Sequence, residues 1–162
     1  RNLFQCYLVN KDERILKAVK KGYDYYKNNL FYNNGRPKHF AVSKYAKLRR
    51  YEMYDYAEGI KLGILLKDFI PDAFEKAKFL ANDLIDSFQT DKGYFLTRVT
   101  SFGTKHKVPY LRWPQAQLIF SLTKLNNEIA TLEWQWFQRE ISDKEYVVAF
   151  DDIQRRIREL EG

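Results

Sequence analysis

The sequence predicts an all-α protein built from antiparallel helical hairpins. Apolar residues recur at intervals of three and four along much of the 162-residue chain, which is the spacing of amphipathic helices. Glycine and proline are few, at 7 and 4 residues, so the composition permits long helices. The order of elements also repeats at a shift of 58 residues. The chain is long enough for one domain, and its 45% of hydrophobic residues can supply a substantial core.

The first half of the chain contains three predicted helices. Residues 2 to 9 are apolar and have the pattern of a helix end. Asn10 can cap the next helix, which is amphipathic and ends at the Asn-Asn-Gly sequence of residues 33 to 35. A loop over residues 36 to 50 leads to a more apolar helix over residues 51 to 69, which we expect to be packed on several sides.

The second half repeats this order. Pro71 begins an amphipathic helix, because its missing N–H does no harm in the first helical turn. A glycine turn follows at Gly93, 58 positions after Gly35, and Pro114 opens another apolar helix after a long loop. Each unit is therefore an amphipathic helix, a glycine turn, a loop and an apolar helix. A stack of helical hairpins fits this pattern.

The pattern also predicts a division into a repeat domain and a tail. We place an α/α-hairpin repeat domain at residues 1–127, with repeat units over about 12–69 and 71–125, and a C-terminal helical tail at residues 128–162. The last helix of the tail begins with a capping box and carries one apolar stripe. It can pack on the body, or it can mediate assembly with a second copy or a partner protein through residues 134–160.

Two stretches resemble the α/α-toroid superfamily. LFQCYLVNKDERILKAVKKGYDYY, over residues 3–26, is similar to the joint between toroid hairpins. GYFLTR and VPYLRWPQAQLIFSL, over residues 93–98 and 108–122, are similar to the glycine-aromatic turn of toroids and the inner helix after it. The superfamily contains six-hairpin glycosidases, polysaccharide lyases and sugar epimerases, and relatives encoded with polysaccharide-synthesis genes. The resemblance covers roughly residues 2 to 125 and implies hairpins stacked as part of a toroid. Toroids usually have six or seven hairpins, so we expect a piece of a longer chain or an open stack that completes itself by association.

The positive charge is concentrated in the two loops. Residues 36–50 and 92–112 contain eleven of the 28 Lys and Arg residues and none of the 21 acidic ones, in a chain of net charge +7. In a hairpin stack both loops lie at one end and lead to the N-termini of inner helices, where free N–H groups favour anions. Aromatic residues beside the loops add faces that suit sugar rings or nucleobases. The alternative is that these loops are merely solvated.

Carboxylates at the start of the 51–69 helix are the candidates for catalysis. Glu52, Asp55 and Glu58 are three residues apart, so they lie near one face of the helix. Two such carboxylates can divide acid and base roles, and we predict Asp55 and Glu58 as that pair. By resemblance, toroid glycosidases and lyases place functional acids at inner-helix N-termini, which is the place of Asp55. Relatives tend to have a histidine closely after this aspartate, whereas tyrosine and alanine follow Asp55 here. The alternative role of Glu52 and Asp55 is to stabilise a helix N-terminus.

The basic and aromatic residues of the same end are the predicted substrate-binding groups. Arg112 can clamp a carboxylate in bidentate fashion, and Trp113 can stack on a sugar or belong to the core. The full predicted set is Arg36, His39, Tyr54, Tyr94, Arg98, Tyr110, Arg112, Trp113 and Gln115.

We expect no metal ion and no cofactor. His39 and His106 are the only histidines, and neither has a histidine or cysteine partner nearby in the sequence. The single cysteine, Cys6, excludes an internal disulfide, and its apolar neighbours predict a buried thiol. There is no P-loop or dinucleotide motif, no signal peptide, and no apolar stretch of membrane-spanning length. We therefore expect a cytoplasmic protein without a membrane partner.

Three functions remain open from the sequence. The first is binding or processing of a carbohydrate, with an acidic saccharide or other anion as partner, and with hydrolase or lyase chemistry if the protein is an enzyme. The alternative is a non-catalytic helical scaffold or oligomerisation module. Nonspecific nucleic-acid binding through the basic loops is the third, and we favour it least because no recognition motif supports it.

Overall fold

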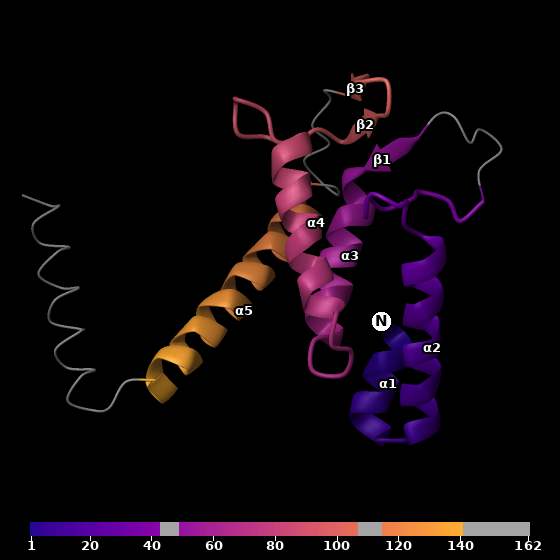
Figure 1. Ribbon diagram of the computed structural model, residues 1–162, viewed down its shortest axis with the longest axis vertical. Helices are drawn as coiled ribbons and strands as arrows, with labels where there is room; N and C mark the ends of the chain where they lie inside the picture. The colour runs from indigo at the N-terminus through magenta and orange to yellow at the C-terminus, as the bar shows by residue number, and fades with distance from the viewer. Residues whose placement is uncertain (43–48, 107–114, 141–162) are drawn as a thin grey trace, which may run out of the picture. The chain divides into compact units, whose positions relative to one another are not determined.

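The computed structural model describes residues 1–42, 49–106 and 115–140, and it is predominantly helical (Figure 1). The chain divides into two compact units, Arg1–Leu125 and Asn126–Gly162, and the contacts described below lie in the first. The elements in chain order are α1 (Asn2–Asn10), α2 (Glu13–Asn29), β1 (Arg50–Glu52), α3 (Met53–Leu66), α4 (Ala73–Phe88), β2 (Arg98–Thr100), β3 (Lys105–His106) and α5 (Ala116–Glu140).

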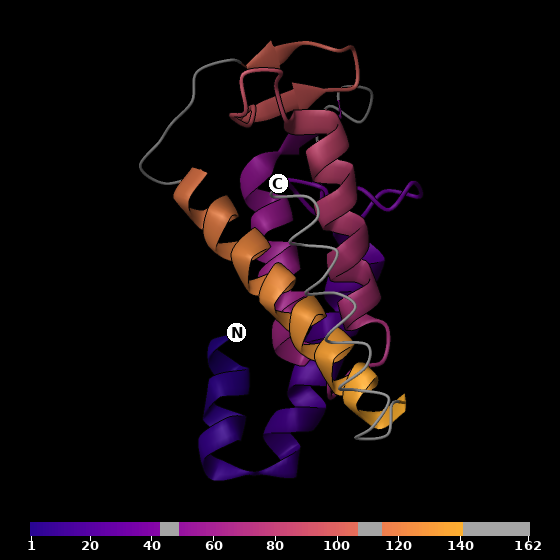
Figure 2. The same cartoon turned by 90° about the vertical axis from the view of Figure 1, so that its left-hand side faces the viewer.

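The helices α1 and α2 form an antiparallel hairpin, seen side by side in both views (Figure 1, Figure 2). The hairpin turns at Lys11, which adopts a left-handed backbone with φ of 54° and donates its N–H to Tyr7 O. Asp12 caps α2 by accepting a hydrogen bond from Arg14 N at 2.9 Å. The cap is therefore Asp12 rather than the predicted Asn10, because Asn10 is still the last residue of α1.

The helices α3 and α4 form the main packed pair of the first unit. Nine of the 14 residues of α3 are buried, which confirms the prediction of a helix packed on several sides. The helix α4 instead buries one stripe, as an amphipathic helix does. The largest fully buried side chains of this pair include Tyr56, Ile60, Leu80, Leu84 and Phe88.

Two glycine turns follow α2 and α4, and they have the same backbone hydrogen bonds 58 residues apart. In the first glycine turn, residues 30–38, the bonds run from Tyr32 N to Arg36 O (2.9 Å), from Gly35 N to Tyr32 O (2.9 Å) and from Lys38 N to Leu30 O (2.8 Å). In the second, residues 88–96, they run from Thr90 N to Tyr94 O (2.9 Å), from Gly93 N to Thr90 O (2.8 Å) and from Leu96 N to Phe88 O (2.8 Å). The two glycines have φ of 80° and 81°. The same turn therefore occurs twice.

A small antiparallel sheet lies beyond the turns. The sequence analysis interpreted the segments of β2 and β3 as a loop, and it placed two of the three residues of β1 at the start of the 51–69 helix. The strand β1 pairs with β2 so that Arg50 faces Thr100 and Glu52 faces Arg98, and β2 pairs with β3. The prediction of a purely α-helical fold is corrected by this sheet. Strands of two or three residues are too short to show a period-two pattern, and distant pairing determines their register. Pairing of β1 with β2 also joins the described end of the first basic loop, at Arg50, to the second basic loop.

Several predictions fall outside these observations or fail. The predicted last helix of the tail lies in residues 141–162, outside the described residues, so the tail and the toroid arrangement stay predictions. The expectation of a buried thiol is wrong, because Cys6 is exposed while α1 turns Phe4 and Tyr7 into the core. Within the described ranges, no helix is both long enough and apolar enough to cross a membrane.

Candidate functional site

The clearest candidate site is a pair of ionisable side chains at the start of α3. His39 comes from the segment after the first glycine turn, and Asp55 lies in the first turn of α3. The Nδ1 atom of His39 lies 2.9 Å from Oδ2 of Asp55. With a proton on Nδ1, the imidazole donates to the carboxylate and Nε2 remains an acceptor. The sequence analysis named both residues, in different roles, and the structure brings them together.

The environment of Asp55 makes its carboxyl group a stronger base than usual. Burial raises the pKa of Asp55 above its ordinary value of 3.8, and the nearby charge of Glu52 acts in the same direction. The hydrogen bond and charge of His39 oppose this rise in pKa. Asp55 is thus suited to hold an imidazole in one orientation and to stabilise it when the imidazole gains a proton.

Two arginines are held beside this pair by one buried carboxylate. Arg50 and Arg98 both donate from Nε to Oε1 of Glu52, which is paired across the sheet with Arg98. The Nη2 atom of Arg50 also lies 3.4 Å from Nε2 of His39. The Glu52 side chain is only 9% exposed, whereas each arginine side chain is 38% exposed. Glu52 therefore holds both guanidinium groups in place, while part of each arginine side chain remains open to solvent. This arrangement suits an anionic ligand.

We call His39, Arg50, Glu52, Asp55 and Arg98 the His39 cluster. An exposed aromatic side chain borders it. The ring of Phe40 lies against the imidazole of His39 edge-on, with ring centroids 4.4 Å apart, and the Phe40 residue is 57% exposed. Tyr54 is 41% exposed on the first turn of α3. Exposed aromatic faces beside cations suit a sugar ring that bears an acidic group.

The second predicted catalytic residue, Glu58, takes part in a different set of ion pairs. It pairs with Lys61 one turn further along α3 and with Arg1, whose Nη1 lies 3.3 Å from its carboxylate. The Lys61 side chain is 7% exposed and also donates to Oε1 of Gln117 at 2.5 Å. Two cations therefore neutralise Glu58, which is not joined to the His39 cluster by these contacts.

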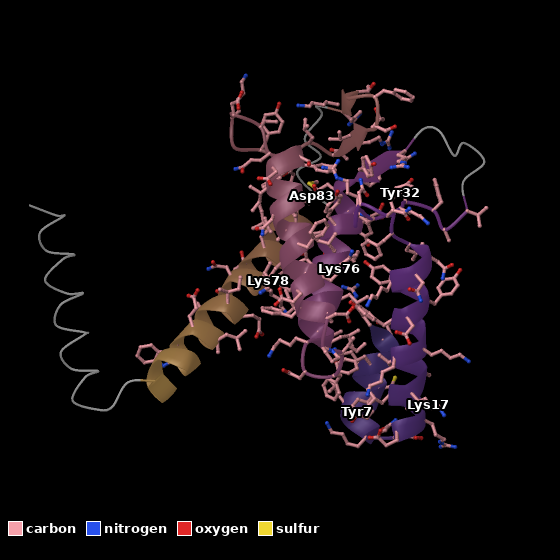
Figure 3. The ribbon with its side chains drawn as sticks, viewed as in Figure 1. Tyr7, Lys17, Tyr32, Lys76, Lys78 and Asp83 are labelled. Atoms are coloured by element: carbon pink, nitrogen blue, oxygen red, sulfur yellow. The ribbon has the colours of Figure 1, made fainter. Side chains whose placement is uncertain are left out.

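Arg36 is bound to α4 rather than to the His39 cluster. Its Nη2 atom donates to Oδ1 of Asp83 at 2.7 Å and to Oγ of Ser87 at 2.7 Å, while its Nε donates to the same carboxylate at 3.1 Å. The hydroxyl of Tyr56 donates to Oδ2 of Asp83 at 2.5 Å. Asp83 is labelled on α4 in Figure 3. Asp83 thus joins the first glycine turn, α3 and α4. These contacts occupy the guanidinium, and a role of Arg36 in substrate binding stays a prediction.

The remaining predicted site residues lie in the second repeat. Gln115 is buried, and its Nε2 donates to the backbone oxygen of Phe95 at 2.5 Å, so it supports the second glycine turn. Tyr94 lies in that turn, where its backbone oxygen accepts from the hydroxyl of Thr90 at 2.8 Å. Three predicted residues lie outside the described ranges: Tyr110, Arg112 and Trp113.

Across residues 1–42, 49–106 and 115–140, no group of three or more His, Cys, Asp and Glu side chains could hold a metal ion. Sequence reasoning missed the roles of Arg50 and Phe40. The absence of acidic residues from the first loop was a signal for Arg50, but nothing in the sequence distinguished Phe40 from other aromatic residues.

Comparison with known proteins yields no relative. No protein-family model, no curated protein and no solved structure matches the chain. The resemblance to α/α toroids therefore stays a prediction that rests on the sequence pattern.

Proposed function

We propose that this protein binds an acidic saccharide at the His39 cluster and that the His39–Asp55 pair accepts a proton from the bound sugar. The observation that carries the proposal is the hydrogen-bonded His39–Asp55 pair beside two arginines that share one buried carboxylate. A base and two fixed cations at one point are the groups that proton removal next to a carboxylate requires.

The arginines define the ligand. Each of them uses Nε to bind Glu52, which leaves terminal N–H donors of the guanidinium to face a ligand carboxylate. Phe40 and Tyr54 offer ring faces for the sugar. A saccharide that carries a uronate group supplies both the carboxylate and the apolar ring face. A neutral sugar lacks the carboxylate and would leave the two cations without an anionic partner.

Among reactions on such a sugar, the contacts favour elimination over hydrolysis. Glycoside hydrolysis uses two carboxyl groups that flank the scissile bond. Here Asp55 is bound by His39, and Glu58 is bound by Lys61. In an elimination, Nε2 of His39 takes the proton from the carbon next to the carboxylate. Arg50, 3.4 Å from that nitrogen, stabilises the negative charge that develops. A carbon–carbon double bond then forms as the bond from the adjacent carbon to the glycosidic oxygen breaks. The departing oxygen takes the proton from Nε2 of His39, so the products are an unsaturated uronate and a free hydroxyl group, and the neutral imidazole is restored.

The test compares oligogalacturonate with a neutral oligosaccharide of the same length by isothermal titration calorimetry, followed by ultraviolet detection of the unsaturated product. We expect binding of the acidic sugar only. Arg98→Ala should weaken it about tenfold or more, because a charged hydrogen bond contributes about 1.5–3 kcal/mol. His39→Ala should retain binding and lose turnover. Arg14→Ala, which removes an exposed arginine at the start of α2, is the matched control and should change neither.

The outcomes separate the two parts of the proposal. Equal binding of neutral and acidic sugars, or full binding by Arg98→Ala, would overturn the binding site. Turnover that survives in His39→Ala would overturn the role of the histidine alone. Repeating the titration at high salt with single-stranded DNA as a further ligand identifies nonspecific charge attraction, which falls steeply as salt rises.

A further inference from the structure

A pocket of about 220 Å³ lies between α1, α2 and α3. None of the residues of the His39 cluster lines it. Its walls are mainly apolar and include Phe4, Val19, Leu62 and Leu66, together with Tyr23 and Tyr26 of α2. An engineered apolar cavity of about 150 Å³ is known to accept benzene, so this volume is sufficient for one substituted six-membered ring.

The polar groups of the pocket are few. Among the described residues, neither Tyr23 nor Tyr26 makes a side-chain hydrogen bond through its hydroxyl group. Burial raises the pKa of Tyr23 to about 12 and also raises the pKa of Tyr26 above its ordinary value, so both hydroxyls keep their protons and can donate. Arg1 also lines the pocket and adds a guanidinium group, which pairs with Glu58.

Gly22, in the middle of α2, lines the pocket and is exposed, so the space beside it is open. A Cβ atom added at Gly22 would meet nothing within 4 Å, although the residue lines the pocket. Glycine is unfavourable inside a helix, and the described protein atoms around this position do not require it. A ligand that lies against the backbone of α2 would require it.

We infer that this pocket binds a small molecule with one aromatic ring and one carboxylate. The apolar walls and the two tyrosine rings, which are tilted at 46° to one another, accommodate the ring. The hydroxyl groups of a sugar would outnumber the polar groups available to them. The carboxylate matches the guanidinium donors of Arg1 in charge and in hydrogen bonding, and Tyr23 adds a hydroxyl donor. This site goes beyond the proposed saccharide site, because it shares no residue with it.

The structure offers a substitution that fills the pocket without disturbing its walls. Benzoate is the probe, measured by titration calorimetry and by the shift of the melting temperature. Gly22→Leu places a side chain in the open space, so it should weaken benzoate binding at least tenfold. The same variant should melt no lower than the wild type, because leucine favours a helix more than glycine does. Gly22→Ala is the matched control, and it should bind benzoate within about threefold of the wild type, since one methyl group leaves most of the about 220 Å³ free.

A second ligand and two arginine variants test which groups bind the carboxylate of benzoate. Phenol, which lacks the carboxylate, should bind more weakly than benzoate, and Arg1→Ala should reduce that preference. Arg98→Ala should leave benzoate binding unchanged. Loss of benzoate binding in Arg98→Ala would show that the anion occupies the His39 cluster, and the inference would then be wrong. Undiminished binding by Gly22→Leu, or no saturable binding of benzoate by the wild type, would also overturn it.

Discussion

The two glycine turns share one backbone and differ in their surroundings. Both contain the same three hydrogen bonds and a glycine with φ near 80°. At Gly35 an added Cβ would lie 2.9 Å from the ring of Phe79, and Lys76 donates to the Gly35 oxygen at 3.1 Å. At Gly93 an added Cβ would meet nothing within 4 Å. Local sequence therefore determines the turn, whereas the neighbouring helix determines how tightly the turn is packed.

The side chains that follow the glycines extend this difference. Arg36 follows Gly35 and binds Asp83 of α4, whereas Tyr94 at the equivalent position cannot form an ion pair. His39 faces Asp55, whereas the equivalent residue of the second repeat is Thr97, which does not titrate. The same turn thus supports an ion-pair network and a candidate proton-transfer site in the first repeat only.

Removal of Asp83 should have the largest effect. Asp83→Ala leaves the guanidinium of Arg36 without its anion and the hydroxyl of Tyr56 without its acceptor. We expect a loss of about 3 kcal/mol in the free energy of unfolding, measured by chemical denaturation. Asp86→Ala, which removes an exposed carboxylate from the same helix, should change stability by less than about 0.5 kcal/mol. If the two variants unfold at the same denaturant concentration, Asp83 does not link the turn to α4.

Substitution of the two glycines should show an intermediate effect that measures the packing directly. Gly93→Ala places an alanine at positive φ in open space, so we expect a loss of about 1 kcal/mol. Gly35→Ala adds the contact with Phe79 to the same backbone cost, so we expect about 2 kcal/mol. Thermal unfolding of both variants checks the order. Phe79→Leu in the Gly35→Ala background should recover part of the loss, and equal losses in the two single variants would contradict the difference in packing.

The smallest expected effect is a pH dependence that only the first repeat can show. The folded pKa of Asp55 is raised, so the folded protein holds this proton more tightly than the unfolded chain does. The stability contributed by Asp55 is therefore full below pH 3.8 and falls as the pH rises through the raised value. Melting curves of the wild type and Asp55→Asn, compared over this range, should show the wild type losing stability relative to the variant as pH increases. The opposite slope would mean that pairing with His39 outweighs burial.

Much of the helical structure could be predicted from the sequence, since long amphipathic segments have a strong period. The ends were harder to predict. The sequence analysis predicted Asn10 as the cap of α2, whereas the structure has Asp12 there, because α1 continues through Asn10. The first residues of the predicted helix over 51–69 became the strand β1, because β2 was available to pair with them. Neither event has a local signal.

The sequence analysis predicted three of the five residues of the His39 cluster as site residues, but it did not predict their arrangement. Asp55, His39 and Arg98 were each named from residue type and loop charge. Their relation depends on Glu52, which holds Arg98 across the sheet and Arg50 beside His39. Arg36 was named for the same reason as Arg98, but a carboxylate on α4 engages it. Both residues are arginines in basic loops that lack acidic residues, so only the fold separates them.

Taken alone, the amino-acid sequence determined the helices, the repeated glycine turn and the concentration of positive charge in two loops. These depend on the periodicity of apolar residues, on backbone conformations that glycine permits, and on composition, all of which act over a few residues. Tertiary structure alone decided that β1 pairs with β2 and that His39 is hydrogen-bonded to Asp55. It also decided that Arg36 forms its ion pair with Asp83 rather than with a residue of the His39 cluster. Those contacts join residues 16 to 50 positions apart, and they form only when packing of the helices brings the segments together.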